Sequence, residues 1–387
     1  MLKPPLAADL VPSNAAAAAS PLRCRTGGRL RNFIRQHLLL WGWQPRQLPE
    51  APPDALVDLA LSRLVGQAAL ADVAEAMGGA DEEARQIGGC ARDAYTVLYA
   101  CAGLAVLAAA CGVAAPGNNL VINLLVLAEL LMLLVLLLTF RKAHRINWHS
   151  HWLALRFHVE FLRVMPLLAA LRDDNLHARM ARDGRDGDVD AVRPEAPHLA
   201  VLHHRHGVDP LVAAQTETQR RQRARLYGRL RDRFEAEPQA YAAQALQYAR
   251  LIGAGQLRYH CLRAQQEHTI VHRVHTLSML AFGLTIVAVL AHFWWHAALL
   301  TIICTGVPAF AASLHGFVAQ EESERLASSY TAMAVRLQGW LDLEPAAAPA
   351  PSLEASQERL AELVELLLSE VQDWHRLFGD KGMYHLG

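Results

Sequence analysis

One carboxylate, Glu129, stands in the middle of a long apolar run and is the residue best placed to do chemistry. The run, 120–140, has one charged residue in 21 positions. An ionised group near the centre of a bilayer costs at least about 2.5 kcal/mol unless it is neutral, paired or in contact with water. Glu129 is therefore a candidate pore-lining or proton-sensitive carboxylate. The competing interpretation is a protonated side chain that is hydrogen-bonded between helices.

Two further residues in the apolar runs could shape a pore. Asn123 precedes Glu129 by six positions, which places the two side chains on roughly opposite sides of a straight helix. Pro308 follows Gly306 by two residues and removes a backbone donor, which permits a bend. We predict Asn123 as a candidate pore residue and Pro308 as a candidate gating hinge, although packing alone also accounts for a proline in a membrane helix.

The polar residues outside the apolar runs predict an ion pair but no metal centre. Arg156 and Glu160 are four residues apart on an expected helix, so we predict a juxtamembrane ion pair. His149 and His151 are two residues apart, which does not align them for metal binding on a helix. A second histidine group, at 203–206, lacks paired ligands. We therefore predict no metal and no cofactor.

Catalytic signatures are absent from the sequence. It has no GxxxxGK[ST] loop, no dinucleotide-binding glycine fingerprint, no GxSxG elbow and no paired catalytic carboxylates. We predict that the protein is not an enzyme. A membrane enzyme built from polar residues of different helices is the alternative that this absence leaves open.

Four apolar runs must position these residues, at 95–115, 120–140, 274–294 and 297–318. About 20 apolar residues in a helix cross the hydrocarbon core of a bilayer. The segments that join the first pair and the second pair are too short for anything but a reversal of direction. The sequence predicts an all-α, polytopic membrane protein with two transmembrane hairpins and long cytoplasmic helical extensions.

The distribution of charge predicts the orientation of these hairpins. Formal net charge is zero, but residues 141–273 hold 22 Lys and Arg against 14 Asp and Glu, and neither hairpin turn has a Lys or Arg. The positive-inside rule then places both termini and this segment in the cytoplasm, with the turns outside. We expect a multi-pass membrane protein whose partner is the lipid bilayer, and no nucleic acid.

Changes in composition divide the chain into eight regions. Residues 30–43 are basic and aromatic, and they suit either a short packed helix or a helix on the membrane surface. Gly78 and Gly79 predict the end of a preceding helix. The predicted regions are a disordered leader 1–28, a small cytoplasmic helical region 29–92, the first hairpin with its exit helix 93–172, a loop 173–214, charged cytoplasmic helices 215–273, the second hairpin with its exit helix 274–343, a linker 344–352 and an amphipathic helix 353–380.

The last helix has a regular apolar stripe. Its apolar residues alternate at spacings of four and three, which is the a/d pattern of a coiled coil and requires a partner surface. We predict an oligomer or partner seam formed by Leu360, Val364, Leu367, Val371, Trp374 and Phe378.

Three stretches give the chain a family resemblance. They read RINWHSHWLALRFHVEFLRVMPLL after the first hairpin, VPAFAASLHGFVAQEESERLASSYTAMAVRL across the fourth apolar run, and LSEVQDWHRLFGDKG near the end. With the hairpins, they cover roughly residues 90–380. The chain resembles the bacterial SLATT proteins, which are two-transmembrane effectors associated with SMODS and SLOG domains, and more closely resembles relatives with two such hairpins.

The resemblance implies a membrane effector of prokaryotic conflict systems, in which a sensor protein or a nucleotide signal triggers an oligomeric pore. The chain departs from many relatives, because its first 90 residues lack the alternating strands and helices of a nucleotide-binding SLOG domain. Two hypotheses follow: a homo-oligomeric, pore-forming or membrane-disrupting effector, and a non-conducting membrane-anchored scaffold that binds a cytoplasmic partner.

Overall fold

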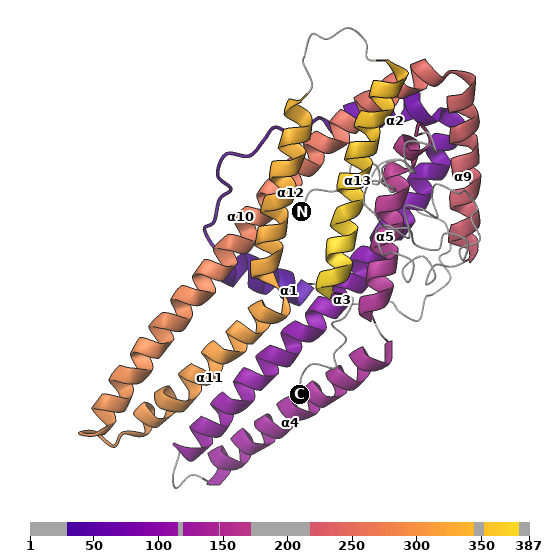
Figure 1. Cartoon of the computed structure of the whole chain (residues 1–387). Coiled ribbons are helices and arrows are strands. Elements are labelled where there is room, and N and C mark those ends of the chain that lie inside the picture. Colours follow the sequence, from indigo (N-terminus) through magenta and orange to yellow (C-terminus); the bar gives the residue numbers. More distant parts are fainter. Residues whose placement is uncertain (1–28, 115–118, 147, 172–216, 344–351, 379–387) are drawn as a thin grey trace, which may run out of the picture.

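Helices make up almost all of the described structure. The computed structural model describes residues 29–114, 119–146, 148–171, 217–343 and 352–378 (Figure 1). No strand occurs among them, which confirms the all-α prediction. The elements are α1 Arg29–Ile34, the π-helical turn η1 Arg35–Leu39, α2 Asp54–Val65, α3 Gln67–Val113, α4 Asn119–Ile146, α5 Trp148–Leu168, α9 Glu217–Ala236, α10 Pro238–His292, α11 Ala298–Gln320, α12 Ser323–Asp342 and α13 Leu353–Phe378.

Four of these helices are long and apolar enough to cross a membrane: α3, α4, α10 and α11. They form two hairpins, α3 with α4 and α10 with α11. The ends at which each hairpin reverses lie at one end of the molecule (Figure 1). Helices α2, α5, α9, α12 and α13 lie at the other end, together with the first halves of α3 and α10. We call this second group the helical body. The four-span prediction is confirmed.

Helices α3 and α10 run without interruption from the helical body into the apolar region. At 1.5 Å per residue they are about 70 Å and 80 Å long. Pro238 stands at the first turn of α10. Backbone N–H groups in the first turn have no partner within the helix, so the missing N–H of proline costs no hydrogen bond there. Both hairpins are thus continuous with the body through a single helix each.

The predicted helix end at Gly78 and Gly79 is wrong, because α3 continues through both residues. A glycine inside a helix costs about 1 kcal/mol relative to alanine. The neighbouring side chains of Met77, Ala80 and Ala84 are buried in the body, and this packing offsets the propensity of the glycines. As a result, residues 69–92 belong to the same helix as the first span.

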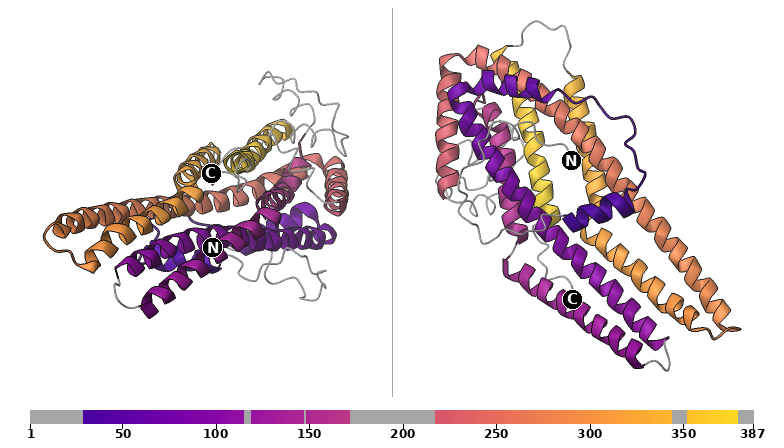
Figure 2. Two further views of the ribbon diagram at one scale, coloured as in Figure 1. Left: turned by 90° about the horizontal axis from the view of Figure 1, so that it is seen from below. Right: turned by 180° about the vertical axis from the view of Figure 1, so that it is seen from behind.

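The four spans pack in the order α10, α11, α3, α4, so the two hairpins meet through α11 and α3 (Figure 2). Helix α4 occupies one edge of this row and has no buried residue in its apolar window. Helix α10 occupies the other edge. The inner side of α10 consists of small side chains at spacings of four and three, which allow α11 to approach closely. They are Ser278, Ala281, Thr285 and Ala288.

The contact between α3 and α11 depends on glycine. A Cβ atom added to Gly103 would lie 2.9 Å from Oγ of Ser313, and one added to Gly316 would lie 2.5 Å from the ring of Tyr99. Real Cβ atoms do not come that close to other heavy atoms. Such close approach of backbones is how helices associate in lipid, where burial of apolar surface gives little driving force.

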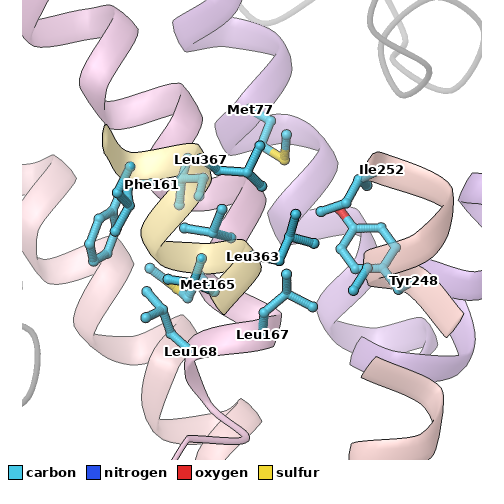
Figure 3. Close-up of a cluster of buried hydrophobic side chains, with 14 of the residues drawn as sticks. Met77, Phe161, Met165, Leu167, Leu168, Tyr248, Ile252, Leu363 and Leu367 are labelled. Atoms are coloured by element: carbon cyan, nitrogen blue, oxygen red, sulfur yellow. The ribbon is translucent and has the colours of Figure 1, made fainter. Parts of the chain in front are cut away.

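The helical body surrounds α5. Its side chains from Trp152 to Leu168 are almost all buried, mainly against α3, α10 and α13, as Figure 3 shows for Phe161, Met165 and Leu168. Side chains from neighbouring helices satisfy the carbonyl groups near its C-terminal end. The hydroxyl of Tyr241 donates to the Pro166 carbonyl at 2.9 Å, and Nε2 of Gln357 donates to the Ala170 carbonyl at 2.7 Å. α5 is therefore fixed in place as the core of the body.

Three of the predicted regions lie outside, or almost outside, the described residues: the leader 1–28, the loop 173–214 and the linker 344–352. The predicted charged segment 215–273 corresponds to α9 and the first part of α10. The predicted exit helix of the second hairpin is α12, which a break at Glu321 and Glu322 separates from α11.

Candidate functional site

A buried cluster of arginines and glutamates lies where the spans meet the helical body. Nε of Arg31 in α1 donates to both carboxylate oxygens of Glu321, at 2.9 and 2.8 Å. Nη2 of Arg35 in η1 donates to Glu267 of α10 at 2.6 Å, and its Nη1 lies 3.5 Å from Glu321. The four side chains are 4 to 11% exposed. We call Arg31, Arg35, Glu267 and Glu321 the ion cluster.

The ion cluster connects both hairpins through the N-terminal segment. Glu267 belongs to α10 and Glu321 directly follows α11, so both acidic residues come from the second hairpin. The backbone N–H of Arg31 donates to Asp93 of α3 at 2.9 Å, which reaches the first hairpin. A short segment of the chain, α1 with η1, therefore connects α3, α10 and the end of α11 where the spans meet the helical body.

Charges in and around the cluster stabilise the ionised form of Glu321. Burial alone would raise the pKa of this carboxyl group, but the nearby charges of Arg31, Arg35 and Arg92 outweigh burial and hold its pKa below the ordinary value. Burial, together with the like charge of Arg31, lowers the pKa of Arg92 to about 10. Glu321 is thus ionised at neutral pH, and its loss would leave buried cations with less compensation.

Further contacts extend the N-terminal segment along α10. Nη1 of Arg273 donates to the carbonyl groups of Leu39 and Trp41, at 3.0 and 2.9 Å. Nη1 of Arg258 donates to the Pro49 carbonyl at 2.8 Å. We call residues 29–49 the strap. Its path along α10 means that the cluster cannot open without moving the strap.

The backbone is strained next to the cluster. Glu322 has a φ of 55° and a ψ of 32°, a left-handed conformation that costs a residue other than glycine about 1 kcal/mol or more. The residue interrupts the helix between α11 and α12, and the Leu326 N–H bonds to its carbonyl at 2.8 Å. The break therefore lies directly next to the buried carboxylate of Glu321.

The candidate pore residues do not come together. Asn123 is exposed on α4, whereas Glu129 is half-buried on the side of α4 that faces α3. The two residues therefore lie on different faces, as their spacing predicts. Pro308 is half-buried inside α11, which continues past it to Gln320.

The predicted ion pair in the helical body is present within a larger buried network. Nη2 of Arg156 lies 2.6 Å from Oε1 of Glu160, and Arg163 binds the other oxygen of the same carboxylate. Glu370 of α13 lies 3.4 Å from Nε2 of the fully buried His260. Burial raises the pKa of Glu370, but His260 and the two arginines outweigh burial and lower it. The network fastens α13 to α5 and α10.

The stripe on α13 has a partner within the same chain. Leu360, Val364 and Leu367 are buried against the body, where α13 contacts α5, α10 and, less extensively, α12. Figure 3 shows Leu367 among these core side chains. These three side chains are unavailable to a second copy while α13 is docked. The side chains of the other predicted seam residues, Val371, Trp374 and Phe378, lie outside the described part of the structure.

Sequence reasoning did not find the ion cluster. Arg31 and Glu321 are 290 residues apart, and no spacing rule pairs residues at that separation. The available signal was weaker: Glu267 shortly precedes the apolar run 274–294 and Glu321 shortly follows the run 297–318, and a charge next to an apolar run requires a partner.

Comparison of the chain with protein-family models, curated proteins and solved structures gives no match. The family resemblance therefore rests on the three quoted stretches and the hairpins. The His203, His204 and His206 group lies outside the described residues, and the described residues hold no group of three or more metal-ligating side chains.

Proposed function

We propose that the chain is a homo-oligomeric membrane effector of a prokaryotic conflict or stress-signalling system, which forms a pore or disrupts the membrane. The observation that supports this most is the row of spans with two unlike edges, α10 and α4. A row of four neighbouring helices has no enclosed interior within the described residues. If several copies were placed edge to edge, their rows of spans would form a closed ring, and the ring would enclose a central pore.

The edges favour a head-to-tail assembly. An α4 edge meeting an α10 edge is a heterologous contact, and such contacts close into rings when the rotation permits. Asn123 is exposed on α4, and an amide in or near the hydrocarbon region gains from a hydrogen-bonding partner on a neighbouring helix. A second copy would supply that helix.

Cysteine cross-linking tests the proposed edge contact. Leu131 on α4 and Leu280 on α10 are 52% and 66% exposed, and each lies about 18 Å along its helix from the hairpin turn. Leu131→Cys and Leu280→Cys chains, mixed in one membrane and oxidised, should give a cross-linked dimer. Leu131→Cys mixed with Val335→Cys, an exposed position on α12, is the control and should not. Equal cross-linking in both mixtures would contradict the head-to-tail ring.

Ion flux from reconstituted vesicles tests conduction itself. Vesicles that stay tight with every candidate trigger would exclude a pore. If the carboxylate of Glu129 faces water in the assembly, Glu129→Gln changes the conductance or its pH dependence. Flux that is unchanged in this variant would assign Glu129 to packing between α4 and α3.

The proposed location is the bacterial inner membrane, with both termini and the helical body in the cytoplasm. The hairpin turns lie at the same end of the molecule, which is what a shared orientation of both hairpins requires (Figure 1). A cytoplasmic sensor protein or a nucleotide signal would then act on the body, and the ion cluster would transmit the change to the spans.

A scaffold that conducts nothing is the second candidate. Helix α9 is rich in arginine and exposes Arg225 and Arg229 at the side of the body, which suits an acidic protein partner. Arg225→Glu with Arg229→Glu should abolish binding of that partner, and vesicles that contain the wild-type chain or this variant should both stay tight. Cutting the chain after Pro351 is a coarser test, because it also removes core side chains of α13.

A further inference from the structure

The strap has a second face that is exposed among the described residues. Phe33, Leu38 and Trp41 are 58%, 64% and 79% exposed. On the opposite face, Arg35 and Leu39 are buried. α1 and η1 are therefore amphipathic, but with the usual sides exchanged. The charged arginines of the ion cluster face the protein, and the apolar and aromatic side chains face outward.

Packing fixes the level of this outer face relative to the spans. Leu39 packs in one cluster with Ile270, Val274, Phe317 and Val318. Val274 stands where the apolar part of α10 begins, and Val318 stands where that of α11 ends. The outer face of α1 and η1 thus lies at the boundary between the apolar spans and the body, where the surface of a bilayer would be.

The composition of the strap suits a headgroup layer. Residues 29–49 contain no Asp or Glu, and both Arg29 and Arg46 are exposed. Aromatic side chains favour the interface between hydrocarbon and water, and exposed arginines favour lipid phosphates. The surface is also continuous with the spans, which already require lipid around them.

We propose that α1 and η1 lie flat in the headgroup layer on the body side of the membrane, with Phe33, Leu38 and Trp41 inserted into lipid. The occupant of the outer face is therefore the bilayer. The proposal depends only on the four spans crossing a membrane and holds whether or not the assembly conducts. Lipid and the ion cluster would then hold α1 and η1 from opposite sides.

Quenching of Trp41 by brominated lipids tests the proposal. The full chain and Trp41→Phe are reconstituted in vesicles with bromine at carbons 6 and 7, or at carbons 11 and 12, of one acyl chain. The emission difference between the two proteins reports Trp41 alone, although the chain has eight tryptophans. We expect this difference to be quenched at least twofold more by the shallow bromines than by the deep ones, and to be insensitive to aqueous iodide.

Two other occupants give different results. Quenching by iodide without quenching by bromine would place the face in water, and resistance to both quenchers would place it against protein, such as a second copy. Either result overturns the proposal. Trp340→Phe is the control, because Trp340 is 4% exposed within the body and its difference signal should resist all three quenchers. Circular dichroism checks that both variants keep the helical fold.

Discussion

Neutralising Glu321 removes the carboxylate that Arg31 and Arg35 share, and Glu321→Gln is the sharpest test of the ion cluster. Glutamine keeps the size of the side chain but carries no charge. The side chains of Arg31 and Glu321 are 11% and 6% exposed, so water compensates little for the loss. Removing one partner of a buried ion pair costs about 3 to 5 kcal/mol. Because Glu267 and Asp93 remain nearby, we expect the lower end, about 3 kcal/mol.

Thermal unfolding of the purified chain in detergent or nanodiscs measures this effect. The unfolding entropy of about 2.1 cal/mol/K per residue sums to about 0.8 kcal/mol/K over the 387 residues, so a loss of about 3 kcal/mol should lower the apparent Tm by about 4 °C. Glu324→Gln is the matched control, because Glu324 is an exposed glutamate three residues further along. If Glu321→Gln lowers the Tm no more than Glu324→Gln does, the ion cluster does not hold the structure together.

The pH dependence gives an independent check of the same reasoning. The pKa of Glu321 is lower in the folded chain than its ordinary value, so its contribution to stability is complete at neutral pH. That contribution is lost as pH falls from the unfolded pKa through the folded one. The wild-type chain should therefore lose stability in acid more steeply than Glu321→Gln. If the stability of the two proteins falls equally steeply with decreasing pH, the ionised carboxylate of Glu321 does not stabilise the fold.

Three further predictions concern other parts of the molecule. Gly316→Ala should lower the apparent Tm through its clash with the α3 side of the row, whereas Gly283→Ala should not, since a Cβ there would meet no atom within 4 Å. Glu370→Gln should also flatten the acid limb of the stability profile, because the pKa of Glu370 is lowered by the buried network; a steeper limb would contradict this. Cutting after Pro351 should expose the apolar side of α5 and increase the binding of a hydrophobic dye to the chain, and no increase would mean that α13 is not part of the core.

The membrane architecture could be predicted from the sequence because it depends on local signals. Long apolar runs and short turns each involve neighbouring residues. The Arg156 and Glu160 pair is similar, since four residues make one helical turn. In each of these cases, the residues that interact in the structure are also close together in the sequence, so a short sequence pattern is enough to predict the interaction.

Contacts between distant segments could not be predicted in this way. The stripe on α13 shows that a partner surface is needed but does not identify α5 as that surface. Gly78 and Gly79 predict a helix end from propensity, yet packing of the residues around them overrides it. The ion cluster requires both hairpins and the strap to be placed in three dimensions before its members meet.

The continuity of α10 has a mechanical consequence. From Glu267 to His292 the helix is about 38 Å long, with no proline in that stretch. If this part of the helix moves as a rigid rod, a tilt of about 10° at the ion cluster would displace the hairpin turn by about 7 Å. α11 and α12 are two separate helices, because the break at Glu322 interrupts them. A movement of the body would therefore reach the two helices of this hairpin unequally, and the hairpin would shear rather than tilt as a unit.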